Sequence, residues 1–389
     1  MATEARTLPP GSVLVHIGPY KTGSTAIQHS LTARRSELEE HGVWYPGPRY
    51  RHMRQSWAVL ERSMRGVDQV PMSEWDDLAE GVRARPADRV CLSSEDFVLA
   101  STTQIERIVH DLGAERVHVL LVARRLDRIL PSGWQERVKS SNETLTYDDF
   151  LAATLAADRS HRSSRNFWFN HELAAILARW SSAVPAERLH VLVADEERHE
   201  RTARVFEQLL GLPDGLLVPA GRANASLSYE RVSLVRRLNE IFDEHGWSDR
   251  DRLKLIHWGM LRGLETVPFG EHETSIPPVP VWAHARLAEL DQERIDSLQL
   301  PGLDVIGNPE LLRSRPGREV PSSSETLGVE AVARAVEGVV AARLQRAQRR
   351  PAPRPAPAPP APTDPGAIPG RALVAELGRR LRRRLTPRR

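Results

Sequence analysis

One lysine stands in a glycine-containing segment whose composition suits the binding of an anion. Residues 17–25 read Ile-Gly-Pro-Tyr-Lys-Thr-Gly-Ser-Thr and join an apolar, β-branched run to a stretch with helical periodicity. In such a loop the backbone N–H groups and the start of the following helix point at one place, where they stabilise a phosphate or sulfate. Gly18 and Gly23 have the spacing of the two glycines in an ATP-binding loop. Lys21, however, lies inside the loop, and Ser24 takes the usual lysine position, which argues against an ordinary ATPase.

Lysine is rare in this chain, so each lysine needs a local reason. The chain has 54 Lys and Arg residues, and only Lys21, Lys139 and Lys254 are lysines. A compact ammonium rather than a planar guanidinium is therefore expected to matter at position 21. The alternative is a simple turn with a Ser or Thr helix cap and a solvated Lys21.

A second candidate for anion binding follows a later apolar run. Residues 122–132 read Val-Ala-Arg-Arg-Leu-Asp-Arg-Ile-Leu-Pro-Ser, with Arg124 eight residues before Ser132. A guanidinium is a permanently charged fork for a phosphate, and a serine hydroxyl adds a neutral donor. Arg125 is the alternative to Arg124, and both could also be ordinary surface charges.

Four apolar, β-branched runs predict the strands that must position these residues. They are residues 12–17, 89–92, 117–123 and 189–194. Helical patterns over 25–40, 171–180, 225–262 and 324–349 alternate with or follow them. This order predicts an α/β fold with a mostly parallel sheet flanked by helices, in which ligands bind beyond the carboxyl ends of the strands.

The end of the second predicted strand supplies a candidate general base. Ser94, Glu95 and Asp96 follow the run at 89–92, where a carboxylate can face the cleft. Glu95 is the first choice, Asp96 competes with it, and Ser94 can orient either. The alternative is that Glu95 caps the next helix or pairs with an arginine.

Taken together, these segments resemble a known family. His16–Thr25 is similar to the 5′-phosphosulfate-binding loop of sulfotransferases that use 3′-phosphoadenosine 5′-phosphosulfate (PAPS). Residues 41–47, His-Gly-Val-Trp-Tyr-Pro-Gly, resemble the continuation in bacterial members, and Arg124 with Ser132 resembles the 3′-phosphate signature. The resemblance covers about residues 11–245 and implies a P-loop-like sulfotransferase fold.

The resemblance also implies roles for individual residues. It makes Lys21 and Glu95 catalytic, with Glu95 as the base, and PAP as the desulfated product. Arg222 and Ser226 resemble a downstream segment near the 3′-phosphate, although Ser226 could instead cap a helix. The implied donor-binding residues are Gly18, Tyr20, Lys21, Thr22, Gly23, Ser24, Thr25, Arg124, Ser132, Arg222 and Ser226.

The expected reaction moves a sulfuryl group from PAPS to a hydroxyl of an acceptor, by in-line displacement and without a metal. The acceptor, whether a carbohydrate, a glycolipid or a small metabolite, stays open, as does the oligomeric state. Residues 156–170 are a candidate lid or acceptor wall, or an ordinary loop. The alternatives are a small-molecule or nucleotide kinase, with Asp96 or Asp195 as poor magnesium ligands, and a non-catalytic binding protein that keeps the fold.

The amino-acid composition sets expectations for the cellular compartment and the binding partners. Apolar residues make up 40% of the 389 residues, Cys91 is the only cysteine, and neither a membrane span nor a secretion signal is visible, so a cytoplasmic protein is expected. The net charge of +3 comes from nine arginines in residues 351–389, so a nucleic-acid-binding core is not expected.

The chain is expected to divide into a flexible start and one large domain followed by a tail. The segments are a flexible 1–10, an α/β domain over 11–320 (core 11–245, helical or irregular part 246–320), a helix within 321–350, a Pro/Ala-rich linker 351–370 and a basic tail 371–389. The tail is predicted to be disordered. A peripheral helix on anionic lipid and a nucleic-acid clamp are the alternatives.

Overall fold

The computed structural model describes residues 6–63, 68–86, 88–217, 227–315 and 326–348. The predicted Pro/Ala-rich linker and basic tail lie outside these residues, as do Arg222 and Ser226. Residues 1–343 form one compact unit, and residues 344–389 belong to a second. Among the described residues, no helix is long and apolar enough to cross a membrane.

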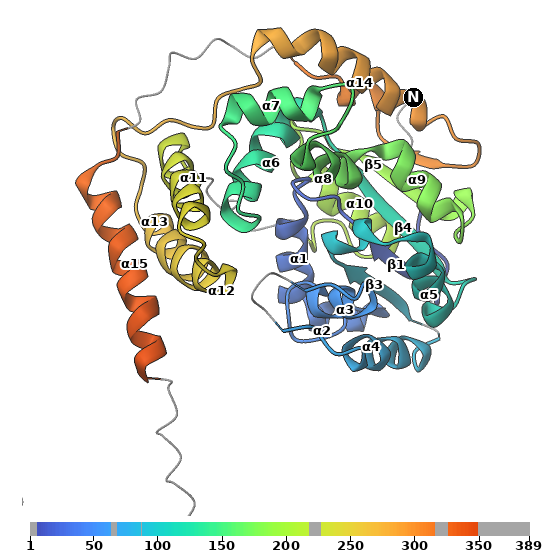
Figure 1. Ribbon diagram of the computed structural model, residues 1–389. Helices are drawn as coiled ribbons and strands as arrows, with labels where there is room; N and C mark the ends of the chain where they lie inside the picture. The colour runs from blue at the N-terminus through green and yellow to red at the C-terminus, as the bar shows by residue number, and fades with distance from the viewer. Residues whose placement is uncertain (1–5, 64–67, 87, 218–226, 316–325, 349–389) are drawn as a thin grey trace, which may run out of the picture. The chain divides into compact units, whose positions relative to one another are not determined.

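The centre of the first unit is a six-stranded sheet in which all strands run parallel, in the order β2-β3-β1-β4-β5-β6. Figure 1 labels β1, β3, β4 and β5 of this sheet. In this register Val15 lies between Leu92 and Val119. The predicted α/β fold is confirmed, and β4 has the predicted ends. The strands are β1 Val13–His16, β2 Val43–Trp44, β3 Arg89–Ser93, β4 Val117–Ala123, β5 Leu189–Val193 and β6 Asp304–Ile306.

Helices cover both faces of the sheet, because the strands are apolar on both sides. Leu14, Leu120 and Leu192 pack against helices on one face, and Val15, Val119 and Val191 pack against helices on the other. The first face is covered by α1 Ser24–Ala33, α2 Arg35–Glu40 and α10 Arg201–Leu210, and the second by α3 Met53–Val59, α4 Ser73–Arg83, α5 Thr102–Leu112 and α9 Leu173–Ser181.

A separate apolar core joins the remaining helices. Its largest fully buried side chains are Trp134 and Phe150, and the Trp134 indole N–H donates to the Leu145 carbonyl at 3.0 Å. The helices are α6 Leu126–Ser140, α7 Tyr147–Leu155, α8 Arg162–His171, α11 Tyr229–Glu244, the π-helix η3 Leu253–Met260, α13 Leu261–Glu265, α14 His284–Ser297 and α15 Val329–Gln348. The short helix α12 Asp249–Arg252 leads directly into η3. Short 3-10 turns are η1 Glu95–Leu99, η2 Ala186–Arg188, η4 Val281–Ala283 and η5 Pro309–Leu312.

Helix α15 meets the η3–α13 segment backbone to backbone. A methyl group on Gly338 would lie 2.2 Å from the Gly259 carbonyl oxygen, and one on Gly263 would lie 2.0 Å from the Arg334 carbonyl oxygen. Only glycine therefore fits at these crossing points. The predicted helix within 321–350 is present, and it is held by this close packing.

Several local predictions differ from the structure. The pattern over 25–40 forms two helices, because the chain leaves helical geometry at Arg34. Of residues 156–170, the candidate lid or acceptor wall, the ordinary-loop alternative does not hold for the second part, because α8 begins at Arg162. Part of the segment 1–10, predicted to be flexible, is packed: Leu8 is buried, and its N–H donates to the Leu209 carbonyl at 2.9 Å.

Candidate functional site

The loop between β1 and α1 is fixed by two glycines and by the neighbouring strand. Gly18 has φ 88° and Gly23 has φ 94°, a left-handed region that favours glycine. The Gly18 carbonyl accepts the Val122 N–H of β4 at 2.8 Å. A Cβ on Gly18 would lie 3.0 Å from Cα of Glu95, so Gly18 lets the loop pass directly beside the candidate base.

The start of α1 has the properties of an anion site. Within the described residues no side chain caps this ten-residue helix, so its first N–H groups are available to a ligand. Thr22 is buried and its hydroxyl donates to the Pro19 carbonyl at 2.8 Å, which holds the loop closed. Thr22 therefore shapes the loop, whereas Ser24 and Thr25 line the adjacent cavity.

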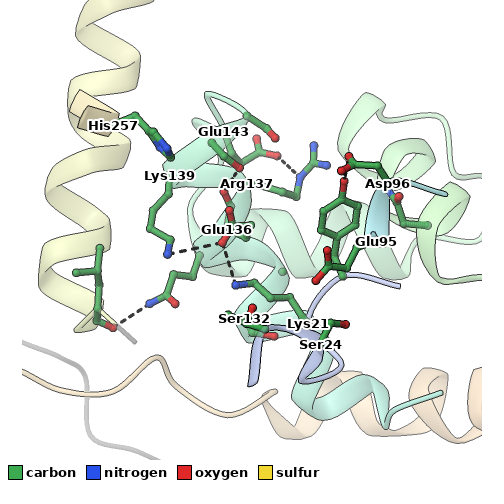
Figure 2. A pocket seen from close by; sticks show the side chains of 18 of the residues that line it. Lys21, Ser24, Glu95, Asp96, Ser132, Glu136, Arg137, Lys139, Glu143 and His257 are labelled. Carbon is green, nitrogen blue, oxygen red and sulfur yellow. Dashed lines mark hydrogen bonds and ion pairs between the residues drawn. The ribbon is translucent and has the colours of Figure 1, made fainter. Parts of the chain in front are cut away.

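Lys21 reaches across this loop to helix α6. Its ammonium donates to Glu136 Oε2 at 2.9 Å, and Lys139 lies 3.6 Å from the same oxygen (Figure 2). Burial alone would raise the pKa of Glu136, but the charges of Lys21 and Lys139 and the hydrogen bond from Lys21 outweigh it and lower the pKa to about 2. Glu136 is therefore a carboxylate at neutral pH.

Glu95 and Asp96 follow the end of β3, and different groups hold their side chains. Arg51 lies 3.3 Å from Glu95 Oε2, so Glu95 does pair with an arginine. Asp96 accepts hydrogen bonds from the Tyr20 hydroxyl and, at 3.2 Å, from Ser94. Burial and the Asp96 charge raise the pKa of Tyr20 well above its ordinary value, so Tyr20 stays a neutral donor.

His52, the buried neighbour of Arg51 in the chain, binds the backbone at the end of β3. His52 Nδ1 accepts the Ser93 N–H at 3.0 Å, so Nε2 carries the proton and donates to the Pro46 carbonyl at 2.9 Å. Burial lowers the pKa of His52 to about 4, which keeps the ring neutral in this arrangement. The segment that carries Arg51 is thereby fixed beside Glu95.

Arg124, at the end of β4, links the loop to the strand beside it. Its Nη1 donates to the Lys21 carbonyl at 2.7 Å, and its Nε and Nη2 bind the two carboxylate oxygens of Glu196 at 2.5 and 2.8 Å. Ser132 donates to the backbone of its own helix, with 2.9 Å to the Arg128 carbonyl. Arg125 is buried and pairs with Asp127 at 3.4 Å.

Most of the predicted site residues meet at one cavity of about 2330 Å³. Figure 2 shows Lys21, Glu95, Asp96 and Ser132 around it, with Glu136 and Lys139 of α6 beside them. Gly18, Thr22 and Arg125 are not in its lining. Arg222 and Ser226 lie outside the described residues. The predicted residues that line the cavity are Tyr20, Lys21, Gly23, Ser24, Thr25, Glu95, Asp96, Arg124 and Ser132.

Sequence reasoning did not identify several residues at this cavity. Arg51 and Glu136 line it, and Glu196 holds Arg124 from the loop after β5. Lys139 could have been found from the rarity of lysine. The others carry no signal in the sequence, because only the fold brings them to the cavity. Among the described residues, no cluster of three or more His, Cys, Asp or Glu could hold a metal ion.

Comparisons with known proteins give little further information. No protein-family model matches the chain, and no curated protein matches it. Among solved structures, it is similar to the crystal structure of a sulfotransferase from Alicyclobacillus acidocaldarius, with 17% sequence identity and a TM-score of 0.37. The match covers 64% of this chain and 97% of that one. A likeness at this level does not assign the chain to a family or to a function.

Proposed function

We propose that this protein is a PAPS-dependent sulfotransferase that moves a sulfuryl group to a hydroxyl of an acceptor. The observation that carries the proposal is the meeting of Lys21, the uncapped start of α1 and Glu95 at one cavity. A cation and helix N–H groups suit a phosphosulfate, and a buried carboxylate suits an acceptor hydroxyl. Arg124 and Ser132, on the same cavity, are the proposed partners of the 3′-phosphate.

The proposed reaction is an in-line displacement at the sulfur atom of PAPS. The acceptor oxygen forms a bond to sulfur while the bond between sulfur and the 5′-phosphate oxygen breaks, and its electron pair leaves with PAP. Glu95 takes the proton of the acceptor hydroxyl. Lys21 and the first N–H groups of α1 stabilise the negative charge that develops on the leaving phosphate. Carbohydrates, glycolipids and small metabolites are the acceptor classes we propose.

Binding measurements test the donor. In isothermal titration of the full chain, we expect PAP to bind and ATP–Mg²⁺ to bind weakly. Lys21→Ala and Arg124→Ala should each weaken PAP binding by at least about tenfold, because each removes a charge-assisted hydrogen bond. Strong ATP–Mg²⁺ binding without a preference for PAP would overturn the proposal and favour the kinase. PAP binding with no transfer in an acceptor screen would favour a non-catalytic binding protein.

A further inference from the structure

Two of the three lysines in the chain converge on one carboxylate oxygen. Lys21, from the loop, and Lys139, from α6, both approach Glu136 Oε2, at 2.9 and 3.6 Å. Figure 2 shows the two ammonium groups reaching this carboxylate from different directions. Nearly all the cationic side chains of this sequence are arginines. Two lysine ammonium groups at one point therefore indicate a binding position for an anionic oxygen.

Glu136 occupies that position as a fixed negative charge. The two lysines lower the pKa of Glu136 to about 2, so this side chain stays negatively charged near neutral pH. Protonation therefore does not release it from the lysines. The three side chains also line the cavity and are partly exposed, with relative areas of 26% for Lys21, 36% for Glu136 and 18% for Lys139. An anionic ligand can therefore exchange with the Glu136 carboxylate.

The position of Lys139 along α6 indicates which part of the donor it would meet. Ser132 and Lys139 belong to the same helix, and seven residues of α-helix span about 10 Å. If Ser132 contacts the 3′-phosphate, Lys139 lies well away from that end of the nucleotide. It lies instead beside Lys21, which the proposed function places at the phosphosulfate.

We propose that Lys139 is a second cation for the sulfuryl group and that Glu136 is the internal counter-ion that the group replaces. This inference rests on the proposed function. When PAPS binds, a sulfuryl oxygen takes the place of Glu136 Oε2 between Lys21 and Lys139. No covalent bond of the protein changes in this exchange. Lys139 then contacts the group being transferred and stabilises its negative charge during the displacement.

Comparison of PAPS with PAP separates the sulfuryl group from the rest of the nucleotide. In titrations of the full chain, Lys139→Met should weaken PAPS binding by about 10- to 100-fold, the usual cost of losing a charge-assisted hydrogen bond, and leave PAP binding within about twofold. Lys254→Met is the matched control, because Lys254 lies outside the cavity lining and should change neither affinity. Lys139→Arg should recover part of the lost PAPS affinity, because the charge returns in a different shape.

A second variant tests the counter-ion. Glu136→Gln should strengthen PAPS binding more than PAP binding, because the competing charge is gone. Equal effects of Lys139→Met on the two nucleotides, or no effect on either, would overturn the inference, as would weaker PAPS binding in Glu136→Gln. Those results leave the proposed function standing. Failure of the unmodified chain to bind either nucleotide would instead overturn the proposed function.

Discussion

Arg124 holds both carboxylate oxygens of Glu196 and, through its remaining nitrogen, the carbonyl oxygen of Lys21. The end of β4, the loop after β5 and the anion-binding loop are thus joined by one guanidinium. Burial opposes the charge on Glu196, but the hydrogen bonds and charge of Arg124 outweigh it and lower the pKa of Glu196. A phosphate that binds Arg124 has to compete with this carboxylate.

Removal of that competitor should strengthen donor binding. We expect Glu196→Gln to bind PAP about two- to fivefold more tightly, because a partly exposed ion pair is worth about 1 kcal/mol at most. Isothermal titration measures the effect. Glu197→Gln is the control, since Glu197 pairs with Arg315 on the surface and should leave PAP affinity unchanged. Weaker PAP binding in Glu196→Gln would mean that Arg124 serves only to hold the loop.

Two glycine variants separate backbone strain from displacement of the base. Gly18→Ala should lower the free energy of unfolding by about 2–4 kcal/mol, because it combines a strained φ with a contact 3.0 Å from Glu95 Cα. Gly23→Ala should cost only about 1–2 kcal/mol, since its Cβ would meet nothing within 4 Å. Urea unfolding followed by circular dichroism gives both values.

The same pair predicts different effects on chemistry. Gly18→Ala should reduce PAPS turnover out of proportion to its loss of PAP affinity, because the added methyl group displaces Glu95. Equal losses in the two measurements, or a smaller loss of stability for Gly18→Ala than for Gly23→Ala, would contradict this account of the loop.

The two carboxylates after β3 should differ in their effect on turnover. Glu95→Gln should lower kcat for sulfuryl transfer by about 10²- to 10⁴-fold with little change in PAP affinity, as expected for loss of a general base. Asp96→Asn should have the smaller effect on kcat, because Asp96 is engaged by Tyr20 and Ser94. Release of PAP from PAPS in the presence of an acceptor measures both. A larger loss of kcat in Asp96→Asn would exchange the two roles.

Three buried, neutral histidines should make the folded chain less stable in acid. Burial lowers the pKa of His16 and His171 to about 3 and that of His52 to about 4. In the unfolded chain these histidines take up protons near pH 6.5, whereas in the folded chain they stay neutral at that pH. Their contribution to the free energy of unfolding is therefore fully present above pH 6.5 and is lost as the pH falls toward 3. Urea unfolding between pH 7 and pH 5 should show this decline.

One of these histidines offers a direct check. His171 packs against Phe167, and its Nδ1 has no hydrogen-bond partner among the described residues. His171→Leu should therefore reduce the dependence of the unfolding free energy on pH between 7 and 5. An unchanged dependence would show that His171 is not buried as a neutral ring in solution.

The strands that carry the site were predictable because they are fully buried. The apolar runs that became β1, β3, β4 and β5 stand out from the sequence, and they place residues 18–25, Glu95 and Arg124 at one edge of the sheet. The strands β2 and β6 have only two and three residues and form no such run. Helix α14 was also missed, since Leu287, Leu290 and Ile295 are scattered among charged residues.

The side chains that contact the predicted site residues could not be predicted from the sequence. Glu136 and Glu196 are ordinary carboxylates in a chain with 51 acidic residues, and Arg51 is one of many arginines. The crossing of α6 over the loop brings Glu136 to Lys21, and the parallel pairing of β4 with β5 brings Glu196 to Arg124. The roles proposed for the site residues stay predictions until donor binding is measured.

The scarcity of lysine also makes the site open to selective chemical labelling. A reagent that modifies primary amines has three side chains to choose from, and two of them are held by Glu136 at the cavity. Lys254 then serves as an internal reference within the same molecule. The ratio of label on Lys21 and Lys139 to label on Lys254, read by peptide mass spectrometry, would report occupancy of the cavity in an extract as readily as in a purified sample.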